Sequence, residues 1–260
     1  MASLMAVSEE KFQQVRIVER KDHSPDLWSV RVRPEAPLPF QPGQYATLGV
    51  DYGSRRVERQ YSIVSSPLEP ELEFFVELVP QGGLSPLLHK LHVGDEFHVR
   101  RQAKGRFTLD VESGHKRHFL VATVTGVAPY MSMARTLARQ AEAGNQPDAE
   151  LFILQAASRS WEFAYRDELD GYAAKYGWIR YIPVVSRPWE DPGWQGEVGR
   201  AEDILRKYLD QFELDSTNAS VYLCGHPQMI ANAKGILRRR GFQKEFVREE
   251  LYWLPSTRAT

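Results

Sequence analysis

The pattern of apolar and polar positions in this chain changes character near residue 110. Before that point, short runs alternate apolar with polar residues, and turns rich in proline, glycine and charge separate the runs. Runs of this kind, rich in β-branched and aromatic residues, are typical of half-buried strands. The pattern predicts strands at 12–20, 27–33, 44–50, 58–64, 72–79 and 96–101, and one short helix at 85–91. Strands at this spacing favour a small antiparallel β-barrel.

From about residue 117 the apolar runs are unbroken, and each is followed by a segment with helical character. Predicted strands lie at 118–124, 151–157, 178–186 and 220–225, and predicted helices at 129–140, 161–176, 200–209 and 227–241. Alternating strands and helices favour a parallel sheet covered by helices on both faces. We therefore predict two domains, a barrel over residues 1–112 and an α/β domain over 113–260, with 112–117 as the linker.

Composition narrows the class of protein. A hydrophobic fraction of 42% in 260 residues indicates a globular chain with a sizeable core. A net charge of −1 gives no overall field toward nucleic acid or membrane, and no apolar run is long enough to span a bilayer. The one cysteine, Cys224, excludes an internal disulfide or a Cys-ligated iron–sulfur cluster within this chain. The histidines lack metal-ligand spacing, so we predict no metal site. The first residues show no charged segment followed by an apolar one, so we predict no signal peptide, and a single cysteine suits the reducing cytoplasm.

Two segments of the predicted barrel carry groups suited to an anion. Arg59 begins the tetrapeptide RQYS in a strand-like run, and Gly82 and Gly83 lead directly into the predicted short helix. Backbone N–H groups in such a turn can bind a phosphate, and a guanidinium adds a charge-assisted hydrogen bond. Ser85 is expected to cap the helix or to bind the same phosphate.

Seven motifs in a fixed order give the chain a specific resemblance to bacterial-type ferredoxin/flavodoxin–NADP reductases. The motifs are FQPGQY (40–45), RQYS (59–62), LEFFVELVPQGGLSPLL (72–88), AKGRFTLD (103–110), VTGVAPYMSM (124–133), LCGHPQM (223–229) and EELYW (249–253). The resemblance implies an FAD-binding antiparallel barrel followed by an NADP-binding α/β domain. It also implies that the terminal segment of the chain covers the flavin.

The resemblance implies three catalytic residues. Ser62 would approach flavin N5, Cys224 would border the nicotinamide, and Glu250 belongs to the terminal motif. Arg59 and Ser85 would hold the FAD pyrophosphate, Tyr61 would lie against one flavin face, and two aromatic residues of the terminal motif would cover the other. The implied FAD contacts are Arg59, Gln60, Tyr61, Ser62, Gly82, Gly83, Leu84, Ser85, Tyr252 and Trp253.

The choice of pyridine nucleotide is read from residues that follow the predicted strands. Arg159 and Arg187 each follow a serine there, and a hydroxyl beside a guanidinium suits the 2′-phosphate of NADP. Two departures from the family pattern oppose this: Arg159 is offset by one position, and Glu197 replaces an arginine. Val124 replaces the first glycine of the family loop and is expected to extend the strand. The predicted NADP contacts are Thr125, Gly126, Val127, Pro129, Ser158, Arg159, Ser186 and Arg187.

The function implied is that of a ferredoxin–NADP(+) reductase, which transfers electrons between NADPH and a separate ferredoxin or flavodoxin through FAD. Two alternatives stay open: an NADH-dependent reductase of free flavin or of an oxygenase, and a non-catalytic flavin-binding subunit. Trp178 and Trp189 are expected to pack inside the fold rather than to contact cofactors. A cluster of basic residues could attract an acidic partner: Arg55, Arg56, Arg100, Arg101, Lys104 and Arg106.

Overall fold

The computed structural model describes residues 11–252, and the chain within that range divides into two compact units. The barrel unit contains residues 11–108 and 131–136, and the α/β unit contains residues 109–130 and 137–252. Trp253, a predicted FAD contact, lies outside the described residues. No helix among residues 11–252 is long and apolar enough to cross a membrane.

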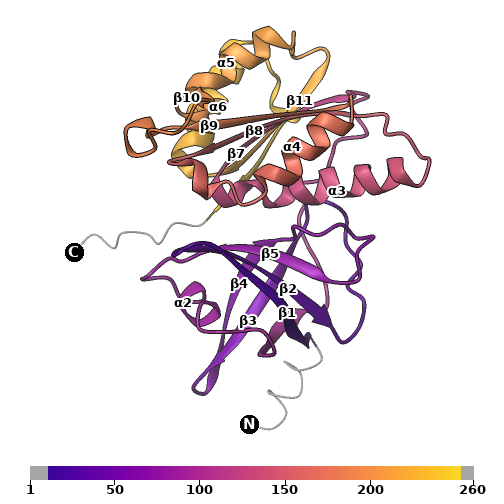
Figure 1. Cartoon of the computed structure of the whole chain (residues 1–260). Helices are drawn as coiled ribbons and strands as arrows, with labels where there is room; N and C mark the ends of the chain where they lie inside the picture. The colour runs from indigo at the N-terminus through magenta and orange to yellow at the C-terminus, as the bar shows by residue number, and fades with distance from the viewer. Residues whose placement is uncertain (1–10, 253–260) are drawn as a thin grey trace. The chain divides into compact units, whose positions relative to one another are not determined.

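The barrel unit is built on one six-stranded sheet in which every pairing is antiparallel (Figure 1). The strand order is β4-β3-β6-β1-β2-β5, and an isolated bridge joins Ile63, directly after β4, to Phe74 within β5, so the two edge strands meet. The elements are β1 (Phe12–Ser24), β2 (Leu27–Pro34), β3 (Tyr45–Tyr52), β4 (Arg55–Ser62), β5 (Leu72–Glu77), the helix α2 (Ser85–Leu88) and β6 (Glu96–Arg100). All six predicted strands are therefore present, and the predicted barrel is confirmed.

The apolar positions of the alternating runs form the core of the barrel unit. Val15 and Ile17 of β1 are buried beside Trp28 of β2 and Phe74 of β5, while the residues between them face outward. Alternate burial of this kind is what a sheet with one dry face requires. The same core receives Leu84 and Leu88, so apolar contact holds the short α2 segment and the turn before it against the barrel.

The α/β unit is a six-stranded parallel sheet in the order β10-β9-β8-β7-β11-β12. Its strands are β7 (Arg117–Thr123), β8 (Glu150–Ala157), β9 (Ile179–Val185), β10 (Glu197–Val198), β11 (Ala219–Gly225) and β12 (Val247–Leu251). Its α-helices are α3 (Ala128–Glu142), α4 (Arg166–Lys175), α5 (Ala201–Gln211) and α6 (Pro227–Arg239). Short 3-10 turns are η1 (Val124–Val127), η2 (Ser160–Glu162), η3 (Pro188–Glu190) and η4 (Lys244–Phe246). The predicted α/β sheet is confirmed, although η2 and α4 replace the single helix predicted at 161–176.

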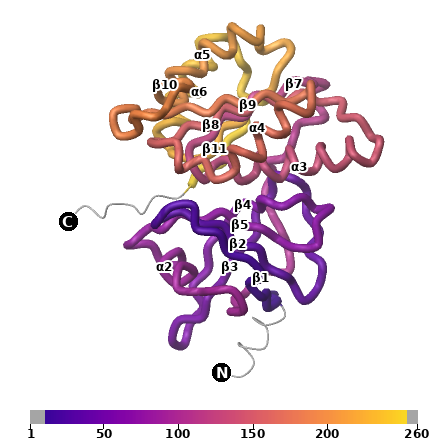
Figure 2. Tube along the Cα trace, in the orientation of Figure 1, coloured from indigo at the N-terminus to yellow at the C-terminus, as the bar shows by residue number. Residues whose placement is uncertain are grey.

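Helices α5 and α6 cover one face of this sheet, and their apolar side chains share a core with β7, β8, β9 and β11. Helices α3 and α4 lie along the other face (Figures 1 and 2). The chain runs from β7 outward to β8 and β9, and then returns to place β11 on the opposite side of β7. The order therefore reverses between β7 and β11, and ligands of open α/β sheets bind beside the strand ends at such a point.

One buried histidine in β7 is expected to make the stability of this unit depend on pH. His118 is 2% exposed, its Nδ1 lies 3.3 Å from the Tyr222 hydroxyl, and that hydroxyl accepts a hydrogen bond from the Asp110 N–H at 2.7 Å. Burial lowers the pKa of His118 to about 4. The imidazole therefore stays neutral in the folded chain at pH values where the unfolded chain binds a proton.

Acidification from pH 7.5 to pH 4.5 is expected to remove about 2 to 3 kcal/mol of unfolding free energy through His118 alone. The loss begins near the ordinary histidine pKa and is complete below the folded-state value of about 4. Urea unfolding of the wild type and of His118→Gln at both pH values measures it. The variant should lose less stability on acidification by that amount, and equal losses in the two proteins would contradict the assignment.

Candidate functional site

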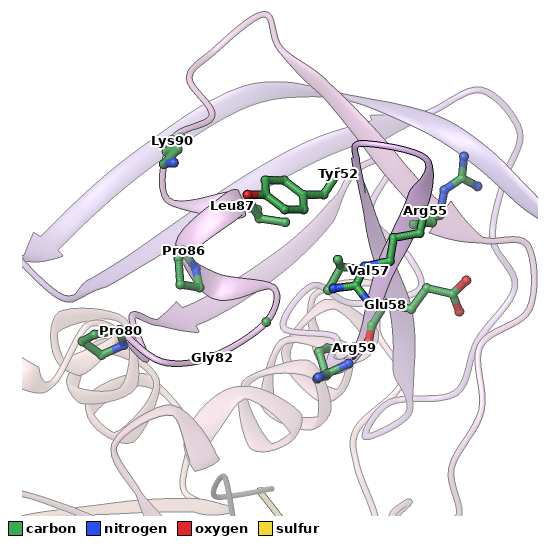
Figure 3. A pocket seen from close by; sticks show the side chains of 12 residues that line it. Tyr52, Arg55, Val57, Glu58, Arg59, Pro80, Gly82, Pro86, Leu87 and Lys90 are labelled. Atoms are coloured by element: carbon green, nitrogen blue, oxygen red, sulfur yellow. Dashed lines mark hydrogen bonds between the residues drawn. The ribbon is translucent and has the colours of Figure 1, made fainter.

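A surface cavity of about 610 Å³ lies in the barrel unit between β4 and the turn that leads into α2 (Figure 3). Residues of β4 and its hairpin line one side, and the turn and α2 line the other. Arg59 is exposed at the β4 side, where one Nη donates to the Glu58 carbonyl at 2.7 Å. The lining residues are Tyr52, Arg55, Arg56, Val57, Glu58, Arg59, Pro80, Gly82, Gly83, Pro86, Leu87 and Lys90.

The turn beside Arg59 presents backbone donors to this cavity. The N–H groups of Gly83, Leu84 and Ser85 donate no hydrogen bond to any residue between 11 and 252. A Cβ atom added to Gly83 would lie 3.1 Å from Nη2 of Arg59, so the guanidinium sits directly over the bare backbone of the turn. Three consecutive free N–H groups and a guanidinium at one place are donors of the kind that can hold a phosphate or pyrophosphate.

Ser85 has a different place from the one expected of an N-cap. The helix cap is Leu84, and Ser85 is the first residue of α2, 5% exposed. Its hydroxyl accepts a hydrogen bond from the Val79 N–H at 3.0 Å and lies 3.4 Å from the Val79 carbonyl. The Ser85 hydroxyl therefore binds the backbone of Val79 in the preceding turn. The prediction that Ser85 caps the helix is wrong, because its hydroxyl is used in this contact and Leu84 occupies the cap position.

The remaining residues of the RQYS motif lie along β4, and their exposure falls toward the end of the strand. Gln60 is exposed and donates to the Tyr45 hydroxyl at 3.2 Å, Tyr61 packs partly against the barrel core, and Ser62 is 5% exposed. Burial raises the pKa of Tyr61 to about 12, so this phenol stays neutral. The strand therefore places a neutral aromatic ring next to a buried hydroxyl.

The loop after β7 does not follow the path expected for Val124. The strand ends at Thr123, and Val124 opens the 3-10 turn η1 with a φ of +44°. The expectation that Val124 extends the strand is therefore wrong. A β-branched residue is strained at positive φ, and the glycine of the family pattern would not be. The predicted contacts Thr125, Gly126 and Val127 are buried in this turn, and Pro129 is the second residue of α3.

Gly126 is the point where the η1 turn meets the end of β11. A Cβ atom at Gly126 would lie 2.3 Å from the Cys224 carbonyl oxygen and 2.8 Å from its carbonyl carbon. β7 and β11 are neighbours at the reversal of strand order, so this contact lies where a nucleotide is expected to bind. Glycine at this position therefore lets the η1 turn lie directly against the backbone of Cys224.

Cys224, Glu250 and Tyr252 lie together at the same edge of the α/β sheet. Cys224 and Glu250 are paired in the register of β11 and β12, and the Tyr252 hydroxyl donates to the Thr125 carbonyl at 2.8 Å. Burial raises the pKa of the Cys224 thiol well above its ordinary value, with Glu250 adding to the effect. The thiol is therefore protonated at neutral pH and is unsuited to be a nucleophile.

The two Ser-Arg pairs predicted to bind a 2′-phosphate are brought together by the parallel sheet. β8 and β9 end side by side, and the Arg187 N–H donates to the Ser158 carbonyl at 3.0 Å. Arg159 and Arg187 both lie close to Glu190, Arg159 in an ion pair and Arg187 with its Nη1 3.6 Å from the carboxylate. The two arginines therefore converge on one negatively charged group.

Glu197, which the sequence placed among possible phosphate contacts as a repulsive charge, has partners of its own. Its carboxylate binds Lys207 Nζ at 2.5 Å and the Tyr208 hydroxyl at 2.9 Å. These hydrogen bonds, led by the one from Lys207, lower the pKa of Glu197. Its charge is therefore largely balanced by Lys207.

Some residues that line the candidate sites were not predicted from the sequence. Tyr52 and Lys90 line the barrel cavity but lie outside every quoted motif. Trp189 was expected to pack, yet it is 73% exposed, and Trp161 is 50% exposed with the Arg159 guanidinium 5.7 Å from its ring centre. Glu190 was also missed. Its place three residues after Arg187 was the available signal, because oppositely charged residues at this spacing can pair.

Comparison with known proteins identifies both units. Residues 14–108 match the oxidoreductase FAD-binding domain family, and residues 120–235 match the oxidoreductase NAD-binding domain family. The chain is 32% identical over 208 residues to a flavodoxin/ferredoxin–NADP reductase of Escherichia coli, covering 76% of this chain and 78% of that protein. It is 27% identical over 245 residues to NADH-cytochrome b5 reductase 1 of Pyricularia oryzae, covering 90% of this chain and 76% of that protein.

Among solved structures, a ferredoxin NADP+ reductase from Neisseria gonorrhoeae with bound FAD and NADP has the same fold. Its TM-score is 0.79 at 24% identity, covering 94% of this chain and 99% of that one. The domain matches confirm the predicted FAD-binding and pyridine-nucleotide-binding parts. Together with the sequence relatives, they show that the chain belongs to the flavodoxin/ferredoxin–NADP reductase family of FAD-dependent oxidoreductases.

Proposed function

We propose that this chain transfers electrons between NADPH and a separate one-electron carrier, a ferredoxin or a flavodoxin. When bound, FAD supplies the redox chemistry, because it takes up two electrons as hydride and returns them one at a time. The coenzyme assignment rests on one observation, the convergence of Arg159 and Arg187 at the ends of β8 and β9. Two guanidiniums beside the hydroxyls of Ser158 and Ser186 suit a phosphomonoester better than a ribose hydroxyl.

The residues of the barrel unit fit FAD. Arg59 and the free N–H groups of residues 83–85 would hold the pyrophosphate, since they supply donors at one place and no carboxylate of residues 11–252 binds them. Tyr61 would present a neutral aromatic face to the flavin ring. Ser62, buried beside it, would donate a hydrogen bond at the reactive edge of the ring.

The residues of the α/β unit fit a pyridine nucleotide at the reversal of strand order. The η1 turn from Thr125 to Val127 and the start of α3 at Pro129 would hold its pyrophosphate. Cys224 and Glu250 would border the nicotinamide, where the protonated thiol supplies packing and no charge. Tyr252 would fix the η1 turn through its hydrogen bond to Thr125.

The partner is proposed to be an acidic carrier protein met in the cytoplasm. Three residues of the expected basic cluster are close to carboxylates: Arg56 to Asp51, Arg100 to Glu58 and Arg101 to Glu35. Arg55 and Lys104 have no ion pair among residues 11–252, so they are the cations available to steer a partner. A steering field from so few charges is short-ranged and weakens with salt.

One observation favours the NADH-dependent alternative. Glu162, Glu190 and Asp191 lie around the Ser158–Ser160 segment, and their negative charges oppose a 2′-phosphate. An NADH-dependent reductase of free flavin or of an oxygenase would need no cation there. The two candidates therefore differ in their acceptor as well as in their coenzyme.

Anaerobic stopped-flow kinetics separates the candidates. The protein is reduced with NADPH and mixed with a ferredoxin, a flavodoxin or free FMN, and the acceptor spectrum is followed. The proposed function predicts rapid reduction of one carrier protein, slower at high ionic strength, and slow reduction of FMN. Rapid reduction of FMN with both carriers inert would reject the proposal in favour of the alternative.

A further inference from the structure

Two of the three carboxylates beside the proposed 2′-phosphate position belong to the hydrogen bonding of the backbone. Glu162 accepts a hydrogen bond from the Ser158 N–H at 2.8 Å, is mostly buried, and also pairs with Nη1 of Arg159 at 3.1 Å. Asp191 is 8% exposed and accepts a hydrogen bond from the Ser160 N–H at 2.7 Å. Releasing either carboxylate would leave a partly buried backbone N–H group without its partner, which costs stability. These two side chains are fixed parts of the turn.

Glu190 is held differently. Its side chain is 34% exposed, and among residues 11–252 its carboxylate contacts only Arg159 and Arg187. It accepts no hydrogen bond from the backbone of the described residues. A partly exposed ion pair of this kind contributes little to stability, so the carboxylate can leave without disturbing the turn.

We propose that Glu190 is the residue that sets discrimination between NADP(H) and NAD(H), by occupying the two arginines that a 2′-phosphate needs. This inference rests on the proposed function, in which Arg159 and Arg187 receive that phosphate. A ligand with a 2′-phosphate must displace Glu190 from Arg159, whereas a ligand with a 2′-hydroxyl leaves the pair intact. Before a nucleotide binds, the negatively charged Glu190 carboxylate therefore occupies the position that the 2′-phosphate would take.

The displaced Glu190 carboxylate is expected to repel the 2′-phosphate even after the phosphate has bound. Glu190 lies within the three-residue turn η3 (Pro188–Glu190), so it stays near the phosphate after leaving Arg159. Two like charges within a few ångströms at a surface repel appreciably, and salt screens the repulsion. Glu190→Gln removes the competing charge and leaves a side chain of the same size.

Binding of adenine nucleotides to the FAD-loaded protein tests the inference without turnover. Isothermal titration with 2′-phospho-AMP and with AMP gives the affinity contributed by the 2′-phosphate. Glu190→Gln should bind 2′-phospho-AMP about tenfold more tightly at low salt and less so at high salt, with AMP affinity within about twofold of wild type. Asp210→Asn is the matched control, because it also removes a carboxylate paired with an arginine, Arg240, and lies on α5.

The outcomes separate this inference from the coenzyme assignment. Unchanged affinity for 2′-phospho-AMP in Glu190→Gln, or equal tightening of both ligands, would overturn the role of Glu190. An equal gain in Asp210→Asn would also overturn it, because the effect would then be one of net charge. A wild type that binds AMP as tightly as 2′-phospho-AMP would reject the NADP assignment, and selective tightening in Glu190→Gln would still support the role of Glu190.

Discussion

Replacing Arg59 by alanine is expected to weaken FAD binding by about 100-fold. The guanidinium stands over Gly83 at the free N–H groups of the turn, so it supplies the positive charge of the proposed pyrophosphate site. Two charge-assisted hydrogen bonds contribute about 3 kcal/mol together, which corresponds to that loss of affinity. The dissociation constant of FAD from the apoprotein, followed by quenching of flavin fluorescence, gives the number directly.

Arg16→Ala is the matched control for Arg59. Arg16 is another exposed barrel arginine, with a side chain 66% exposed and paired with Glu96, and it lines no part of the cavity. Its removal should leave FAD affinity unchanged. Equal FAD affinity in Arg59→Ala and wild type would contradict the pyrophosphate site, and equal losses in both variants would point to general charge instead.

Gly126→Ala is expected to destabilise the α/β unit by about 3 kcal/mol, since overpacking against rigid backbone costs this order. The added methyl group would lie 2.3 Å from the Cys224 carbonyl oxygen, and no flexible side chain is available to move away. Relief requires that the η1 turn and the end of β11 separate. Because this is the proposed nucleotide position, affinity for NADPH should fall together with stability.

Gly171→Ala is the matched control for this substitution. Gly171 lies within α4, and an added Cβ atom would have no heavy atom within 4 Å. Alanine favours a helix more than glycine does, so this variant should be more stable by about 0.5 to 1 kcal/mol. Guanidinium unfolding measures both variants, and a Gly126→Ala protein as stable as wild type would show that the loop has room to adjust.

The fold could be predicted because its signals are local. Alternating burial in β1 and continuous burial in β8 are visible as sequence periods, and they distinguish an antiparallel sheet from a parallel one. The convergence of Ser158 and Ser186 could also be predicted, since parallel strands end at one edge.

The predictions that proved wrong concern residues whose conformation depends on tertiary contacts or on the path of the backbone. The hydroxyl of Ser85 does not cap the helix, because the turn places the Val79 N–H within hydrogen-bond distance of it. Val124 has high strand propensity, yet the chain must turn into η1 directly after β7, and that requirement decides its conformation. Trp189 is apolar, but it lies in the three-residue turn η3 and its side chain is exposed there.

The central claim is that NADPH delivers its electrons to FAD bound by this chain. Anaerobic titration of the FAD-loaded protein with NADPH, and separately with NADH, tests it by following the visible flavin absorbance. We expect stoichiometric bleaching of the flavin by NADPH, at a rate well above that with NADH. A flavin that stays oxidised with both coenzymes would contradict the enzymatic assignment, and bleaching tenfold faster with NADH would contradict the role of Arg159 and Arg187 in coenzyme choice.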